Sequence, residues 1–176
     1  MSRVDKRPAI SLGQFNKAIK TPEENIKYAI SETTPLVWYA LLHGIDDDFK
    51  HGEYLVRAEL TAKFPYDPPW FYLMTPNGVY DIEKKVCIDI GGYHSQNFRA
   101  ALGVGGFLKQ LVSGLIGGID HGISILHTSS AEKKQLALQS REYNLQHNKA
   151  ILEHVEAVYA EYSAKWTPSN DANSMQ

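Results

Sequence analysis

The hydrophobic and polar positions in the first half of the chain predict an antiparallel sheet. Residues 36–42 are a continuous apolar run, which is typical of a buried strand, and a polar connection follows at 43–52. Apolar and polar residues alternate from 54 to 63, so this strand should place one face on the core and the other mostly toward water. With the aromatic run at 70–74, the pattern predicts a meander of at least three strands. No fourth strand is apparent from periodicity.

A capping motif predicts a helix before the sheet. Ser11 is followed three residues later by Gln14, which is a capping-box pattern, and apolar positions recur at helical spacing until Thr21 and Pro22. We therefore expect a short first helix that opens at Ser11. Residues 21–30 allow a second helix.

An apolar stripe predicts a central helix after the sheet. Its apolar positions recur at i, i+1, i+4 and i+5 from 107 to 116, between glycine-rich ends at 103–106 and 117–118. We expect this stripe to pack on the sheet.

Further helices are predicted near the end of the chain. Ser129 with Glu132 is a second capping box, and it opens a polar helix whose apolar positions are Leu136, Leu138 and Tyr143. Residues 149–166 carry another helical pattern.

Length and composition indicate one domain in a reducing compartment. The 176 residues predict a domain over 11–166, between a flexible N-terminus at 1–10 and a disordered tail at 167–176. The net charge of −2 argues against nucleic-acid binding and against a polybasic membrane protein. The single cysteine excludes an intrachain disulfide and leaves a core thiol or a nucleophile. With no signal peptide and no apolar run of about 18 residues, we expect no membrane segment and a cytoplasmic location.

The densest set of turn-forming residues lies around the cysteine. Three prolines in 64–69 exclude a helix there, and Thr75-Pro76-Asn77-Gly78 closes the third strand with a turn. Cys87 follows Asn77 by ten positions, in an apolar stretch with Val86, Ile88 and Ile90. The chain should therefore reverse at Asn77 and return to the core near Cys87.

Taken together, these motifs resemble the catalytic core of the ubiquitin-conjugating enzymes. The Thr75-Pro76-Asn77-Gly78 form, the gap of ten to Cys87, the Tyr93-His94 pair and the stretch 134–140 resemble the branch that is tail-anchored in the endoplasmic reticulum membrane. The match covers about Leu12 to Tyr143. It implies an α+β ubiquitin-conjugating fold, with an antiparallel meander sheet packed on a central helix, an N-terminal helix and C-terminal helices. The family has four strands and an extended lead at 21–30, so a helix and an extended segment both stay open there.

The resemblance also implies an activity in the ATP-dependent pathway of ubiquitin conjugation and protein degradation. Cys87 would accept ubiquitin as a thioester from the activating enzyme and yield it to a substrate lysine, for which sulfur is both nucleophile and leaving group. The Asn77 amide could order its loop and also stabilise the oxyanion. A carboxylate or imidazole would orient or deprotonate the lysine, and the candidates are Asp89, His94, Asp120 and His121. No cofactor or metal is implied, since ATP is used by the activating enzyme.

The expected partners are ubiquitin, its activating enzyme and a ubiquitin ligase, of the RING type. The resemblance assigns ligase binding to Tyr66 and to a second loop of Phe98, Arg99, Ala100 and Ala101. Phe98 stands where Trp is usual and Ala100 where Pro is usual, which affects partner choice more than catalysis. The protein would act at the cytosolic face of the endoplasmic reticulum if a C-terminal anchor has been removed from this chain.

Three other interpretations differ in the role of the cysteine or in the modifier. The modifier carried could be another ubiquitin-like protein. A non-catalytic ubiquitin-binding variant would lack Cys87. A papain-like hydrolase would need a helix that opens at the cysteine, whereas Cys87 lies in a β-like stretch.

Overall fold

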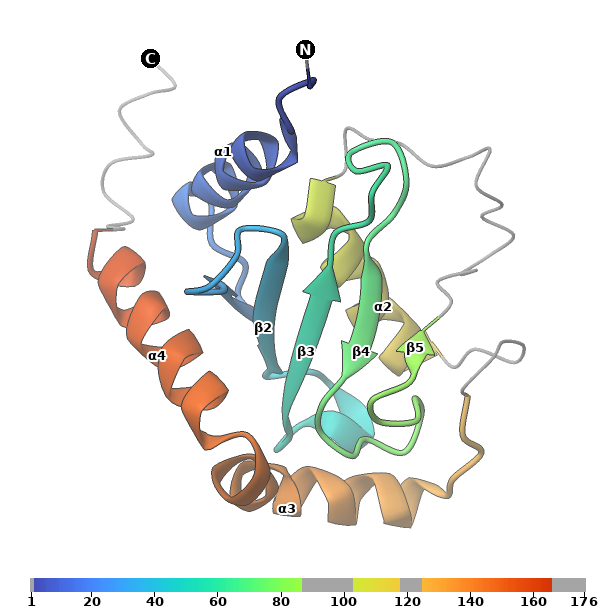
Figure 1. Cartoon of the computed structure of the whole chain (residues 1–176). Coiled ribbons are helices and arrows are strands. Elements are labelled where there is room, and N and C mark those ends of the chain that lie inside the picture. The colour runs from blue at the N-terminus through green and yellow to red at the C-terminus, as the bar shows by residue number, and fades with distance from the viewer. Residues whose placement is uncertain (1, 87–102, 118–124, 166–176) are drawn as a thin grey trace, which may run out of the picture.

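The computed structural model describes residues 2–86, 103–117 and 125–165, which form an α+β fold (Figure 1). The described elements are, in chain order, α1 (Arg7–Lys20), β1 (Ile26–Ile30), β2 (Val37–His43), the 3₁₀ turn η1 (Asp47–Phe49), β3 (Glu53–Glu59), β4 (Trp70–Leu73), β5 (Lys85–Val86), α2 (Gly103–Gly117), α3 (Ser130–His147) and α4 (Lys149–Ala164).

The strands form one antiparallel meander of order β1-β2-β3-β4-β5. Each strand pairs with the next along the chain, with Ala40 opposite Val56 and Phe71 opposite Val86. The predicted meander is therefore confirmed, with β1 and β5 added to the three strands that periodicity showed. Residues 26–30 within the ambiguous stretch are a strand and not a second helix.

One face of the sheet packs on the central helix, as the apolar stripe predicted. Trp38, Val56 and Phe71 of this face share a buried cluster with Leu108 and Leu111 of α2. Phe15 of α1 belongs to the same cluster and meets the Trp38 ring edge-on, at a centroid distance of 5.2 Å. Helix α2 lies behind the strands in Figure 1.

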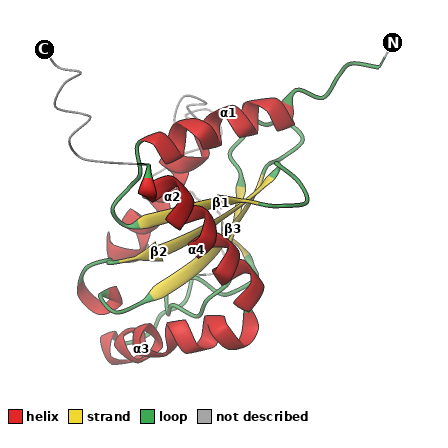
Figure 2. Cartoon of the chain, turned by 90° about the vertical axis from the view of Figure 1, so that its left-hand side faces the viewer, coloured by secondary structure: helices red, strands yellow, loops and turns green. Residues whose placement is uncertain are grey.

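The opposite face is covered in part by α4, so the expectation that alternate positions of β3 face water is wrong at Leu55. Leu55 is fully buried with Leu41 of β2 and with Leu152 and Val155 of α4. In Figure 2, α4 lies across β1, β2 and β3. The sequence pattern of β3 does not reveal that a helix covers its second face, because that helix lies about a hundred residues later in the chain.

Helix α4 also covers the open edge of β1. The Tyr28 N–H donates to the Tyr162 hydroxyl at 3.0 Å, and His154 Nε2 donates to the Ile30 carbonyl at 2.7 Å. Edge strands present unpaired backbone groups that favour pairing with other chains. Two side chains of α4 satisfy such groups here.

The first helix begins at Arg7, four residues before the predicted start at Ser11, so residues 7–10 are helical rather than part of the N-terminal segment. Ser11 is buried and does not cap the helix. Its hydroxyl donates to the Pro35 carbonyl and accepts from Trp38 Nε1 at 2.8 Å. The capping-box pattern failed here because the serine pairs with the sheet instead of with its own helix.

The second capping box is confirmed at the start of α3. The Ser129 hydroxyl accepts from the Glu132 N–H at 3.1 Å, and the Glu132 carboxylate accepts from the Ser129 N–H at 3.2 Å. The predicted apolar positions of this helix are not its buried face, since Leu138 is 66% exposed. Ala137, Ser140 and Asn144 are buried instead. No described helix is long and apolar enough to cross a membrane.

Candidate active-site loop

The loop that connects β4 to β5 is organised around the side chain of Asn77, which is only 1% exposed. Its Nδ2 donates to the carbonyls of Thr75 and Tyr80, each at 3.0 Å. Its Oδ1 accepts from the N–H groups of Val79 at 2.9 Å and Tyr80 at 2.7 Å. Both amide hydrogens and the amide oxygen are thus engaged within the loop. The Asn77 side chain thus satisfies backbone N–H and carbonyl groups that would otherwise need a neighbouring strand.

A segment before α3 holds the other side of the loop. The Thr128 hydroxyl donates to the Gly78 carbonyl at 2.6 Å, and the Leu126 N–H donates to the Val79 carbonyl at 2.7 Å. Gly78 has a φ of 84°, and a Cβ there would lie 2.7 Å from Thr128 Oγ1. Glycine is therefore required both for its backbone conformation and for the close approach of Thr128.

Thr75 connects the loop to β3 and α3 through a buried polar chain. Its hydroxyl accepts from the Leu55 N–H at 2.9 Å and donates to Asn144 Oδ1 at 2.6 Å. Asn144 Nδ2 in turn donates to the Glu53 carbonyl at 2.9 Å. A small hydroxyl can accept from a strand and donate to a helix at the same point, so Thr75 suits the position next to the loop.

Sequence patterns did not identify Asn144, Thr128 or Asn148 as parts of this site. Asn148 Nδ2 donates to the Met74 carbonyl at 3.2 Å, next to Thr75. The available signal was a helical spacing of small and polar residues at 137, 140 and 144, on a face without large apolar side chains. Such a face is hidden from a search for hydrophobic periodicity.

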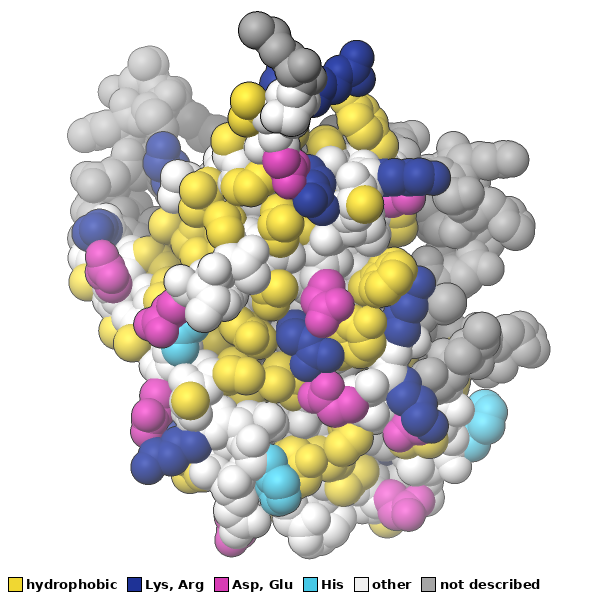
Figure 3. All heavy atoms as spheres, viewed as in Figure 1, with side chains coloured by type: hydrophobic (Ala, Val, Ile, Leu, Met, Phe, Trp, Pro, Cys, Tyr) yellow, Lys and Arg dark blue, Asp and Glu magenta, His cyan; other side chains and the backbone are white. Residues whose placement is uncertain are grey.

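The segment after the loop is fixed to the sheet before it reaches β5. The Glu83 N–H donates to the Leu73 carbonyl at 2.9 Å, and the Glu83 carboxylate pairs with Arg57 Nη1 at 3.0 Å. Arg57 also pairs with Glu59 at 3.0 Å and lies over the Tyr72 ring, 4.6 Å from its centroid. Figure 3 shows basic and acidic side chains next to one another near the centre of the face that it presents.

Two carboxylate partners offset the burial of Arg57. Burial alone would lower the pKa of Arg57, but the hydrogen bonds that it donates to Glu83 and Glu59 raise it above the ordinary value. The charged guanidinium holds the segment around Glu83 on the sheet.

Tyr80 places an aromatic ring under the loop. The ring is buried in the main core, and within the described part of the chain its hydroxyl has no hydrogen-bond partner. Burial raises the pKa of Tyr80, so the phenol stays neutral. Its ring supports the loop by packing.

Strand β5 leads directly to the cysteine in sequence. Val86 is buried and pairs with Phe71, and Lys85 Nζ lies 3.9 Å from the centroid of the Trp70 ring. The predicted site residues Cys87, Asp89, His94, Phe98, Arg99, Ala100, Ala101, Asp120 and His121 lie outside the described residues.

Of the predicted site residues, the structure describes Asn77 and Tyr66, and it places them beyond opposite ends of β4. Tyr66 is 77% exposed in the connection from β3 to β4, whereas the neighbouring Phe64 is buried. An exposed aromatic side chain beside a buried anchor is available for contact with another protein. Within the described residues, no group of three or more His, Cys, Asp or Glu side chains is arranged to hold a metal ion.

Comparison with known proteins identifies relatives of one kind, although no family model matches the chain. Ubiquitin-conjugating enzyme E2 32 of Arabidopsis thaliana is 28% identical over 147 residues, which cover 78% of this chain and 45% of that protein. Ubiquitin-conjugating enzyme E2 J1 of Homo sapiens is 28% identical over 147 residues, covering 78% of this chain and 44% of that protein. The chain thus spans slightly less than half the length of these relatives.

A solved structure shows the same fold. The structure of human ubiquitin-conjugating enzyme E2 G1 superimposes with a TM-score of 0.55 and 19% identity, and covers 65% of this chain and 98% of its own. The family resemblance and the fold expected from the motifs are both confirmed.

The Thr75 chain of hydrogen bonds yields a prediction about stability. Thr75→Val preserves the shape of the side chain but leaves the buried Leu55 N–H without its acceptor. We expect the free energy of unfolding to fall by about 1–3 kcal/mol, measured by urea denaturation. The exposed Thr33 provides the control, since Thr33→Val should change stability by less than about 0.5 kcal/mol.

A double-mutant cycle isolates the Thr75 contact with α3. Asn144→Ala removes the same hydrogen bond from the other side, so the double variant should lose less stability than the sum of the single losses. Strict additivity, or a Thr75→Val variant as stable as the parent, would contradict this account.

Proposed function

We propose that this chain, a relative of the ubiquitin-conjugating enzymes with their fold, is the catalytic domain of such an enzyme. The observation that carries the proposal is the similarity over 78% of the chain to proteins named ubiquitin-conjugating enzymes. It is supported by the loop held on Asn77, which precedes the strand that leads to Cys87.

In the proposed reaction, Cys87 carries ubiquitin between two proteins. The Cys87 thiolate attacks the thioester carbonyl of ubiquitin on the activating enzyme, and the thiolate of that enzyme leaves. A lysine amine of the substrate then attacks the new thioester, an isopeptide bond forms, and the Cys87 thiolate leaves. The ammonium proton passes to a nearby base, for which Asp89, His94, Asp120 and His121 are the candidates.

Asn77 is proposed to serve the second step in two ways. Its four hydrogen bonds keep the loop in one conformation. Since both amide hydrogens are bonded to loop carbonyls, donation to the oxyanion requires one of these bonds to open as negative charge develops. An oxyanion offers a stronger acceptor than a peptide carbonyl, so this exchange is favourable in the transition state.

A ligase is proposed to bind at Tyr66, because this large side chain is exposed and lies next to a rigid set of prolines. For a protein in which a membrane anchor follows this chain, the resemblance to the tail-anchored branch supports action at the cytosolic face of the endoplasmic reticulum. Carbonate extraction of such an anchored protein tests this location, and its complete release from membranes would contradict it.

The first functional prediction concerns the adduct with ubiquitin. With activating enzyme, ATP and ubiquitin, the chain should form an adduct that a thiol reductant removes, and Cys87 is the one cysteine that can carry it. Cys87→Ser should give a thiol-resistant oxyester, because an alkoxide is a poorer leaving group than a thiolate. Non-reducing electrophoresis is the measurement. Charging of Cys87→Ala would refute the proposal.

The second functional prediction separates the roles of Asn77. Asn77→Ala should accept ubiquitin but discharge it to free lysine about 10²-fold more slowly, as when one oxyanion donor is lost. Its melting temperature should also fall, since four loop hydrogen bonds disappear.

Thr128→Val is the matched control for Asn77→Ala. It loosens the same loop by removing the bond to the Gly78 carbonyl, but it leaves the Asn77 amide in place. Single-turnover discharge and melting curves of both variants distinguish stabilisation of the oxyanion by Asn77 from ordering of the loop. If Thr128→Val slows discharge as much as Asn77→Ala does at a similar melting temperature, Asn77 acts only by ordering the loop.

The third functional prediction concerns the ligase surface. Tyr66→Ala should reduce ligase-stimulated discharge about 5–30-fold, as expected when 1–2 kcal/mol of binding is lost, and should leave the ligase-free rate unchanged. Leu138→Ala, at a similarly exposed site on α3, should affect neither rate. An equal loss in both variants would remove Tyr66 from the ligase surface.

A further inference from the structure

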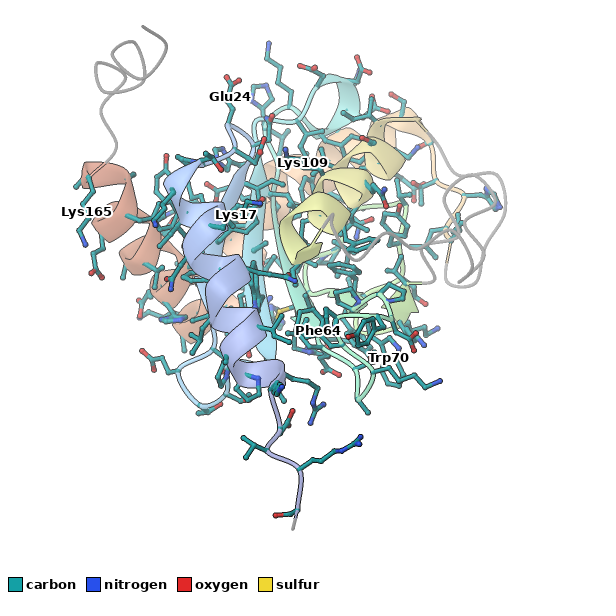
Figure 4. The ribbon with its side chains drawn as sticks, turned by 90° about the horizontal axis from the view of Figure 1, so that it is seen from above. Lys17, Glu24, Phe64, Trp70, Lys109 and Lys165 are labelled. Carbon is teal, nitrogen blue, oxygen red and sulfur yellow. The ribbon has the colours of Figure 1, made fainter. Side chains whose placement is uncertain are left out.

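A cavity of about 450 Å³ lies between α1 and the first turns of α2. Its wall on α1 includes Gln14, Lys17 and Ala18, and its wall on α2 includes Gly105 and Lys109. In Figure 4, the two helices lie side by side and the labelled Lys17 and Lys109 lie in the region between them. The cavity is separate from the loop around Asn77 and shares no residue with it.

The floor of the cavity contains the Tyr28 side chain. Tyr28 lines the cavity and is only 1% exposed, and its hydroxyl bonds to no residue in the described part of the chain. This hydroxyl lies 3.5 Å from the position of a Cβ built on Gly105, so it approaches the start of α2. Burial raises the pKa of Tyr28, with smaller contributions from Glu23 and Tyr162, and the phenol therefore remains a hydrogen-bond donor. An acceptor that enters the cavity can take a hydrogen bond from this hydroxyl.

The beginning of α2 adds further donors. The first N–H groups of a helix have no partner within it, and they carry a partial positive charge. Gln14 Oε1 accepts from the Val104 N–H at 3.1 Å, and no side chain in the described part of the chain accepts from the neighbouring N–H groups of Gly103 and Gly105. Three of the first four residues are glycines, at 103, 105 and 106, so no side chain shields these amides from the cavity.

The charged groups of the cavity sum to one positive charge. Lys109 Nζ pairs with Glu23 Oε1 at 2.5 Å, and both residues line the cavity. Lys17 has no ion pair among the described residues. The Glu23 carboxylate opposes an anion, but its charge is balanced by Lys109, and Lys17 supplies the excess.

We propose that this cavity binds a small phosphate monoester, whose phosphate lies between Lys17, the Tyr28 hydroxyl and the N–H groups of Gly103 and Gly105 in the first turn of α2. Helix N-termini with an adjacent cation are favourable sites for phosphate groups. The volume of about 450 Å³ leaves room for an organic group beside the phosphate. A single excess lysine suits one phosphate and not a polyphosphate chain. The inference does not depend on the chemistry proposed for Cys87.

The direct test is titration of the whole 176-residue chain with glycerol 3-phosphate, monitored by ¹⁵N NMR and calorimetry. We expect saturable shifts of the amides of Gly103, Val104 and Gly105, whereas glycerol and sodium chloride at matched ionic strength should cause none. Vesicles of phosphatidylcholine with and without phosphatidic acid provide a second arm. Binding to the acidic vesicles alone assigns the phosphate to a lipid headgroup, and binding of neither probe overturns the proposal.

Variants locate the site and separate binding from folding. Lys17→Met should weaken binding about 10-fold, whereas Lys20→Met, which removes a lysine that borders a different cavity, should leave affinity unchanged. Tyr28→Phe should also weaken binding, but without lowering the melting temperature of the free protein, because the lost hydroxyl bonds to none of the described residues. Equal effects of the two lysine variants would overturn the proposal, as would normal binding by Tyr28→Phe.

A substitution of Glu23 should strengthen binding instead of weakening it. Glu23→Gln removes the carboxylate that neutralises Lys109, so the affinity for glycerol 3-phosphate should rise. A fall in affinity would show that the Lys109 pair builds the site rather than opposing the ligand, and would contradict the charge assignment made above.

Discussion

The buried amide of Asn77 is the interaction on which the candidate active site depends. Residues 75–80 leave the sheet after β4 and, apart from one bridge between Tyr80 and Ile125, pair with no described strand, yet most of these residues are buried. Four hydrogen bonds to one side chain satisfy these groups, each worth about 0.5–1.5 kcal/mol net. Only an amide can donate and accept in this way, since a carboxylate has no hydrogens and an aliphatic side chain has neither. The turn and the chemistry proposed for it therefore depend on the same atoms.

Elements that are distant in sequence hold the loop in place. Thr75 passes a hydrogen bond from β3 to Asn144 of α3, and Thr128 ties the turn to the segment before that helix. Helix α3 is thus part of the support of the loop, although it begins more than fifty residues after it. Arg57 also stabilises this region, on the outer face of the sheet. It pairs with Glu59 and with Glu83, and Glu83 belongs to the segment that leads to β5.

The two faces of the sheet pack against different elements. The face toward α1 and α2 holds the main core, and it also creates the cavity in which Tyr28 and Lys17 meet the start of α2. The other face is divided between α4 and the charged surface around Arg57. Because α4 covers the edge of β1 as well as Leu55, the sheet is closed on the side away from β5. The proposed catalytic loop and the proposed phosphate cavity are therefore built on separate parts of one scaffold.

Features that depend on local spacing could be predicted from the sequence alone. Alternation and apolar runs gave β2, β3 and β4, the glycine-bounded stripe gave α2, and the turn at Asn77 followed from Pro-Asn-Gly. The motif spacing around Cys87 also indicated the family, because those residues are close together in the chain.

Tertiary structure decided whatever depends on a distant partner. Ser11 matched a capping box, yet it bonds to Trp38 and Pro35, while Ser129 with the same local pattern does cap its helix. The burial of Leu55 and the role of Asn144 both required partners far along the chain. A local sequence pattern reflects only the interactions of a residue with its neighbours along the chain. Whether a residue forms a buried hydrogen bond or lies on a covered face depends on the element that packs against it in the folded protein.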